Sequence, residues 1–177
     1  MPRYKVILES VTPLLMNKAP TPGSNKTFNM RPDVAAEQAA YRMNVTGNRN
    51  LCIPKANFQS CLLAGSAFYE KQGSEHITLA RAVAAGVRVV TDIDLGTAHF
   101  ALDTQTVKIG DTTRGQRYRP RIDSWKGTVV IDVEEIRFDE LKQILNDAGR
   151  FVGLMEKRPE KLKGSNGQFR VISITSA

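Results

Sequence analysis

Hydrophobic and polar positions alternate near both ends of the chain, which is the pattern of half-buried β-strands. Near the N-terminus Tyr4, Val6 and Leu8 alternate with Lys5, Ile7 and Glu9, and near the C-terminus a strand is predicted over 169–175. The first strand is expected to bend or end at Pro13, because proline donates no ladder hydrogen bond. Residues 17–32 contain three prolines and a glycine and predict a long loop, a feature that is often functional.

Four helices are predicted, two of them from apolar stripes at helical spacing and two from alanine-rich segments. Asp33 is expected to cap a short helix over 34–43, and a second helix begins just after Pro54 and stops at Gly73. A third covers 80–85, and the strongest covers 139–148. The second helix has an apolar stripe of Phe58, Cys61, Leu62, Gly65, Phe68 and Tyr69. The apolar face of the last helix is formed by Phe138, Leu141, Ile144, Leu145, Ala148 and Val152.

The segments between these helices predict further strands and turns. Strands are expected over 50–53, 87–93 and 100–109, with turns at 45–48 and 110–111. Two more strands, over 117–122 and 128–134, flank a turn at 124–127 and predict a β-hairpin. Strands interleaved with helices indicate an α+β fold, an antiparallel sheet with helices on one face. The expected architecture is one RRM-like or ferredoxin-like domain over 1–177, with loop and hairpin insertions.

The composition indicates what kind of protein this is and which sites it is not expected to have. The chain has 177 residues, 41% hydrophobic and 24% charged, as in an ordinary globular domain. No apolar run approaches the ~20 residues needed to span a bilayer, and the N-terminus lacks a signal-peptide core, so a cytoplasmic location is expected. Cys52 and Cys61 match no zinc spacing and are expected to be free thiols, Cys61 buried in the helical stripe.

The net charge of +7 is spread along the chain, but one stretch concentrates basic residues. Residues 114–126 hold five basic residues and one acid. Such a cluster is typical of a protein with a polyanionic partner, although a solvated basic loop has the same composition.

Arg117, Arg119 and Arg121 alternate, so on a strand their side chains share one face. That row suits contacts to successive phosphates, or it is a charged, exposed sheet edge. Arg114 and Lys126 flank the row and extend it. Trp125, the only tryptophan, is expected either to stack on a base or to anchor the predicted hairpin in the core.

Two other basic segments are candidate nucleic-acid contacts. Near Gly164 and Gly167 the chain carries Lys157, Arg158, Lys161 and Lys163, although two glutamates interrupt this run. The long loop carries Lys18, Lys26 and Arg31, together with Phe28 and Met30. His76 and His99 are isolated and are expected to be structural, and no catalytic, metal-binding or cofactor-binding motif is present.

Three segments resemble the RAMP superfamily of CRISPR-associated proteins, and within it the Cas7-like backbone subunits of effector complexes. Residues 4–16 (YKVILESVTPLLM) are similar to the opening strand of those proteins, which often runs into a Thr-Pro-Leu or Ser-Pro-Leu step. Residues 50–67 (NLCIPKANFQSCLLAGSA) resemble their strand, Ile-Pro and helix segment. Residues 148–153 and 164–169 resemble the glycine-rich loop before the last strand, although they carry fewer glycines than usual.

The resemblance implies a subunit that binds single-stranded RNA along an RRM-like sheet and assembles side by side with copies of itself and other subunits. The chain is shorter than most Cas7-like subunits, which implies a reduced or phage-borne variant. Some relatives cut a bound target with an aspartate in the loop after the first strand, but residues 17–32 contain no acid, and Asp33 is expected to be a helix cap.

Three hypotheses follow for the function. The first is a non-catalytic RNA-binding subunit of a ribonucleoprotein, with DNA as an alternative to RNA. The second is a RAMP-type endoribonuclease, independent of metal if His76 or His99 serves. The third is a phage-encoded mimic that docks on a host protein complex.

Overall fold

The computed structural model describes residues 1–20, 30–67, 69, 78–108, 111, 113–161 and 164–177. Its larger sheet has six antiparallel strands in the order β3-β5-β8-β1-β9, with β4 also paired to β8. These strands are β1 (Arg3–Ser10), β3 (Cys52–Ile53), β4 (Val87–Val89), β5 (Ile93–Asp94), β8 (Lys126–Val133) and β9 (Phe169–Ser176). The smaller sheet has the order β2-β7-β6, from β2 (Leu14–Leu15), β6 (Ala101–Lys108) and β7 (Arg114–Ile122).

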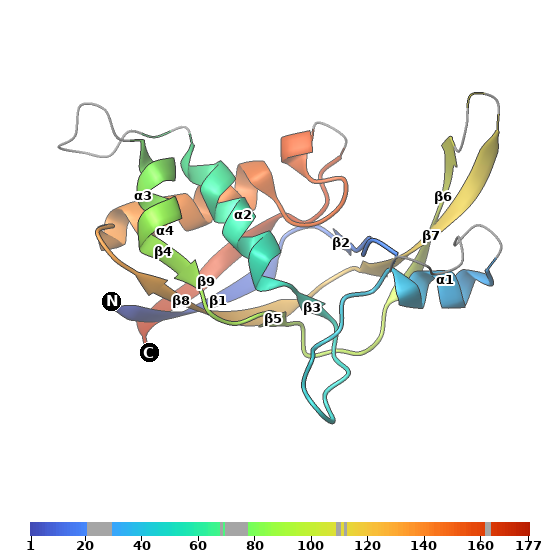
Figure 1. The fold of residues 1–177 in the computed structure, drawn as a ribbon, viewed down its shortest axis with the longest axis horizontal. Helices are drawn as coiled ribbons and strands as arrows, with labels where there is room; N and C mark the ends of the chain where they lie inside the picture. The colour runs from blue at the N-terminus through green and yellow to red at the C-terminus, as the bar shows by residue number, and fades with distance from the viewer. Residues whose placement is uncertain (21–29, 68, 70–77, 109–110, 112, 162–163) are drawn as a thin grey trace.

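Helices α2 (Lys55–Ser66), α3 (Leu79–Gly86) and α4 (Phe138–Asp147) lie together on one side of the larger sheet, as Figure 1 shows. The core lies between them and the sheet. Val6, Leu8 and Ile131 point into it from the strands and meet Phe58 and Leu141 from the helices, all at 0–1% exposure. The described C-terminal part of the chain also forms a π-helical turn, η2 (Ala148–Val152), and a 3-10 turn, η3 (Pro159–Lys161).

The smaller sheet lies at one end of the molecule, where the β6–β7 hairpin projects from the rest of the fold (Figure 1). Helix α1 (Pro32–Gln38) packs against β7 and makes fewer contacts with β6. The two chain termini lie at the opposite end.

The α+β class predicted from the sequence is confirmed. The first strand, the helix after Pro54, the helix over 139–148 and the closing strand all form, within a few residues of the expected bounds. The strand expected over 87–93 is divided into β4 and β5.

The predicted hairpin of 117–122 with 128–134 is wrong. Both segments are strands, but β7 pairs with β6 and β2, whereas β8 pairs with β1, β4 and β5. The chain therefore passes from the smaller to the larger sheet at 123–125 instead of turning back on itself. The turn-forming residues at 124–127 do not make the chain reverse, because residues 126–127 already belong to β8, which pairs with β1.

Three helix details also differ from expectation. Helix α1 ends at Gln38, and its N-cap is Arg31; Asp33 is a first-turn residue whose carboxylate accepts hydrogen bonds from the Arg31 guanidinium at 2.9 and 3.2 Å. Helix α2 ends at Ser66, before Gly73, which lies outside the described residues. Phe138 is 47% exposed and lies on the edge of the α4 face, with its ring centroid 5.9 Å from that of Tyr4.

Candidate nucleic-acid interface

A groove of about 750 Å³ lies where the β6–β7 hairpin joins the larger sheet. Four segments that are distant in sequence form its lining. The lining residues are Glu9, Ser10, Leu95, Thr97, His99, Phe100, Ala101, Arg121, Ile122, Asp123, Ser124, Trp125, Lys126 and Arg170. The groove thus brings together Arg121, Trp125 and Lys126 from the basic stretch identified in the sequence.

One side of the groove is a row of charged residues on three neighbouring strands. Glu9 of β1 lies between Lys126 of β8 and Arg170 of β9, in direct cross-strand register. The Arg170 guanidinium binds the Glu9 carboxylate, and Arg121 binds Asp123 at 2.8 Å. The side chains of Arg170 and Arg121 remain 67% and 47% exposed, so both cations are accessible to a ligand in the groove.

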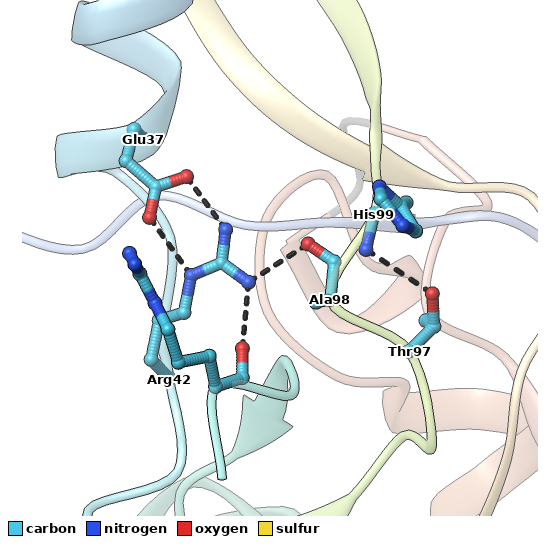
Figure 2. A network of polar contacts seen from close by, with 6 residues as sticks. Glu37, Arg42, Thr97, Ala98 and His99 are labelled. Carbon is cyan, nitrogen blue, oxygen red and sulfur yellow. Dashed lines mark hydrogen bonds and ion pairs between the residues drawn. The ribbon is translucent and has the colours of Figure 1, made fainter. Parts of the chain in front are cut away.

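The opposite side of the groove is the segment 97–100, which Arg42 holds in place. The Arg42 guanidinium donates to both carboxylate oxygens of Glu37, at 2.8 and 2.6 Å, and to the carbonyls of Arg49 and Ala98, each at 2.8 Å. Figure 2 shows this network, in which the His99 backbone amide also donates to the Thr97 hydroxyl at 3.1 Å. Burial raises the pKa of Glu37, but the Arg42 hydrogen bonds outweigh it and leave that pKa below its ordinary value.

Trp125 is part of the core, which supports its interpretation as an anchor over its interpretation as a stacking platform. It is 4% exposed, and its backbone amide donates to the Ser10 hydroxyl at 2.9 Å. Its indole N–H is buried without a hydrogen-bond partner in the described part of the protein. The ring therefore offers no open face to a base.

The arginine row of β7 is not a uniform surface, which corrects the expectation that all three side chains face solvent. Arg121 lines the groove, Arg117 is half-buried, and Arg119 is only 4% exposed. The central section of β7 is covered because it is the middle strand of its sheet and α1 packs on it. Glu156 lies 3.7 Å from Arg119, and burial lowers the pKa of this guanidinium although Glu156 acts in the opposite direction. Arg119 cannot reach a strand bound at the surface.

The remaining predicted contacts lie away from the groove. Arg114 is exposed at the outer end of β7. Arg158 is held by Glu160 and by the Met155 carbonyl, both at 2.9 Å, next to Lys157 and Lys161. Lys18 and Arg31 are exposed near α1. Lys26, Lys163 and His76 lie outside the described residues.

The charged row at the groove continues along the face of the larger sheet that points away from the helices. The register places Lys5 opposite Val130 and Thr175, and Arg3 opposite Asp132, which Arg88 also faces. Among the described strand residues this open face carries five cations and three carboxylates. They are Arg3, Lys5, Arg88, Lys126 and Arg170, with Glu9, Asp94 and Asp132.

Sequence reasoning missed Arg170, Phe100 and the role of His99 as lining residues. Nothing local marks them, because neither Arg170 nor the His99–Phe100 pair belongs to a basic cluster or a recognisable motif. The cysteines offer no reactive thiolate. Burial is the main cause that raises the pKa of Cys52 to about 11 and that of Cys61 to about 12.

No protein-family model matches the chain, and no curated protein matches it. Across the described residues, no helix has both the length and the apolar character needed to cross a membrane. The function is therefore argued from the geometry and charge of the groove and the open face.

Proposed function

We propose that this protein binds single-stranded nucleic acid, RNA in preference to DNA, as a non-catalytic subunit of a ribonucleoprotein. The observation that carries the proposal is the convergence of Arg121, Lys126 and Arg170 on one groove, from which further cations continue across an open sheet face. A track of cations beside a groove is the usual way in which proteins follow a flexible phosphate backbone.

The order of the larger elements supports an RRM-like or ferredoxin-like core within this proposal. The succession β1, α2 and α3, β4, β8, α4, β9 is a β-α-β-β-α-β series, with β1 between β8 and β9 and all neighbours antiparallel. RRM domains use the open face of such a sheet to bind single-stranded RNA. The resemblance to Cas7-like subunits agrees with this arrangement and adds side-by-side assembly with copies of the chain.

The open face has hydroxyl groups but lacks an aromatic stacking platform among its described residues. Thr128, Ser173 and Thr175 lie between the charged ends of the face, beside Ile7 and Val130. Hydroxyls can exchange hydrogen bonds with a ribose 2′-hydroxyl, which DNA does not have. Affinity is then expected to come mainly from phosphate contacts and to depend weakly on base sequence.

The test is the salt dependence of binding to a labelled oligouridylate of roughly 20 nucleotides. Replacing Lys126 and Arg170 together with alanine is expected to weaken binding and to reduce the slope of log affinity against log salt by about one ion per lost contact. Arg81 and Lys142 are exposed on α3 and α4, on the helical side, and their double alanine variant is the matched control. Absence of binding by the wild type, or equal loss in both variants, would refute the proposal. The matching deoxyribose oligomer tests the preference for RNA.

One observation favours a second candidate, a metal-independent ribonuclease. The groove places His99 with Lys126 and two carboxylates, those of Glu9 and Asp123, in one lining. A histidine base beside a cationic group is the minimum for attack of a 2′-hydroxyl on the adjacent phosphate, which yields a cyclic phosphate and a free 5′-hydroxyl. RNA cleavage in the presence of a chelator, lost in His99→Ala, would favour the nuclease; intact RNA after long incubation favours the binding subunit.

A further inference from the structure

Arg42 makes four hydrogen bonds to three separate parts of the chain. Its Nε and Nη2 bind Glu37 of α1, and its Nη1 binds the carbonyls of Arg49 and Ala98. The guanidinium carbon also lies 5.9 Å from the centroid of the Phe100 ring. The Arg42 side chain is only 22% exposed, and Figure 2 shows it between α1 and the segment of Ala98 and His99.

These contacts fix a wall of the groove from behind. Ala98 immediately precedes His99 and Phe100, both of which line the groove, whereas Arg42 is not among the lining residues. The bonds to Glu37 and Arg49 hold the guanidinium itself, and its bond to the Ala98 carbonyl then fixes the backbone next to His99 and Phe100. The segment 97–100 is not part of a strand, and the Leu51 backbone amide holds only its first residue, by donating to the Thr97 carbonyl at 2.7 Å.

We propose that Arg42 is a positioning residue for the nucleic-acid groove. It sets the backbone of segment 97–100 so that His99 and Phe100 lie where a nucleotide bound beside Lys126 meets them. This role rests on the proposed function. The energetic principle is pre-organisation: a wall already held in its bound position need not be ordered when the ligand arrives.

Lysine cannot replace Arg42 in this role although it keeps the charge. The guanidinium places donors on three nitrogens in a planar fork, and here each nitrogen is used. The lysine ammonium is a single point with three donors and cannot span Glu37 and two carbonyls with the same geometry. Arg42→Lys thus separates positioning from electrostatic attraction.

The experiment measures the affinity of a short oligouridylate of roughly four nucleotides, which fits a single groove. Arg42→Lys is expected to weaken its binding about tenfold while the salt slope stays that of the wild type. In a His99→Ala, Phe100→Ala background the same change is expected to cost less than about twofold, because the wall that Arg42 positions is already gone. Arg49→Lys, an exposed neighbour on the surface, is the charge-conserving control and is expected to bind as the wild type.

Additive effects in the two backgrounds, or unchanged binding by Arg42→Lys, would overturn the positioning role. If Arg42→Lys is unfolded at the assay temperature, Glu37→Gln repeats the test, since it keeps the guanidinium and removes its charged acceptor. The proposed function fails separately: in that case the wild type does not bind the oligomer, or Lys126→Ala leaves binding unchanged.

Discussion

Arg119 and Arg121 are two positions apart on one strand and share one face, yet their environments are opposite. Arg121 is accessible in the groove and paired with Asp123. Arg119 is covered, its Nε and Nη1 have no hydrogen-bond partner in the described protein, and Glu156 is 3.7 Å away. A buried, poorly bonded cation is costly, because its desolvation is not fully offset. Two arginines on one strand can thus differ in role: one is accessible at the surface, and the other is buried at a cost in stability.

The two arginines are therefore expected to respond differently to substitution. Arg119→Met replaces the buried cation with an apolar chain of similar length, so the free energy of unfolding is expected to stay equal or to rise by about 1 kcal/mol. Its salt slope for RNA binding should match the wild type. Arg121→Ala is expected to leave stability nearly unchanged and to lower the slope by about one ion. Urea denaturation and binding titrations measure both; a slope lowered by Arg119→Met would place that side chain on the bound strand.

Glu37 is expected to make the stability of the fold depend on pH. Its hydrogen bonds from Arg42 depress its folded-state pKa, so the pair stabilises the fold at pH values above the unfolded pKa of about 4.3. That contribution is lost as the pH falls through the lower, folded-state value. The difference in unfolding free energy between the wild type and Glu37→Gln is expected to be constant from about pH 7 to 5.5 and to shrink below about pH 4. A difference that does not change down to about pH 3 contradicts the linkage.

At the level of elements, the periodicity of apolar residues predicted which segments form helices and strands, but it did not predict which strands pair with each other. The apolar stripes of α2 and α4 and the alternation of β1 identify buried faces: Phe58 and Leu62, Leu141 and Ile144, and Val6 and Leu8 are all buried, whereas Phe138 at the start of α4 is exposed. Turn-forming residues at 124–127 predict a hairpin of the two flanking strands, yet these strands belong to different sheets. In the structure β7 pairs with the preceding strand β6 in a local hairpin, whereas β8 pairs with β1, which is distant in sequence.

Gly149 shows why a glycine is needed where the turn η2 meets β9. A Cβ at this position would lie 2.2 Å from the Phe169 carbonyl oxygen, closer than any relaxed contact allows. Gly149→Ala is therefore expected to lower the free energy of unfolding by about 3 kcal/mol. Gly47 has φ +80° but open space around it, so Gly47→Ala is expected to cost only about 1 kcal/mol. Urea denaturation compares the two, and equal costs would show that η2 moves away from β9 without strain.

At the scale of the whole molecule, the candidate interface is assembled from segments that no local motif joins. The basic stretch 114–126 contributes Arg121 and Lys126, and the sequence identified both. Glu9, Phe100 and Arg170 come from three other segments; strand register brings Glu9 and Arg170 beside Lys126, and the segment before β6 brings Phe100 to the same groove. Composition predicts the positive charge of the interface, whereas the shape of the interface can be seen only in the folded structure.

The projecting hairpin gives the last prediction, which concerns assembly. Lys108 and Arg114 face each other near its outer end, and a two-stranded hairpin is marginally stable without a partner. Beyond the part that α1 supports, we expect the hairpin to contact a neighbouring subunit on the same strand. Gln105 and Arg117 are directly paired, so replacing 106–116 with Asn-Gly closes a short two-residue hairpin between them.

This shortened variant is expected to melt within about 2 °C of the wild type, because none of the described residues in the removed part belongs to the buried core. Its binding to an oligouridylate that fits one subunit should be nearly unchanged, whereas its cooperativity on a strand of roughly 60 nucleotides should fall. The matched control is Lys108→Ala with Arg114→Ala, which removes the charge but keeps the full hairpin. Titrations on both strand lengths, with mass measurement of the complexes, make the comparison. Equal loss of affinity on the two strand lengths would show that the hairpin contacts only the strand. If the double alanine variant lost as much cooperativity as the shortened variant, the length of the hairpin would be irrelevant.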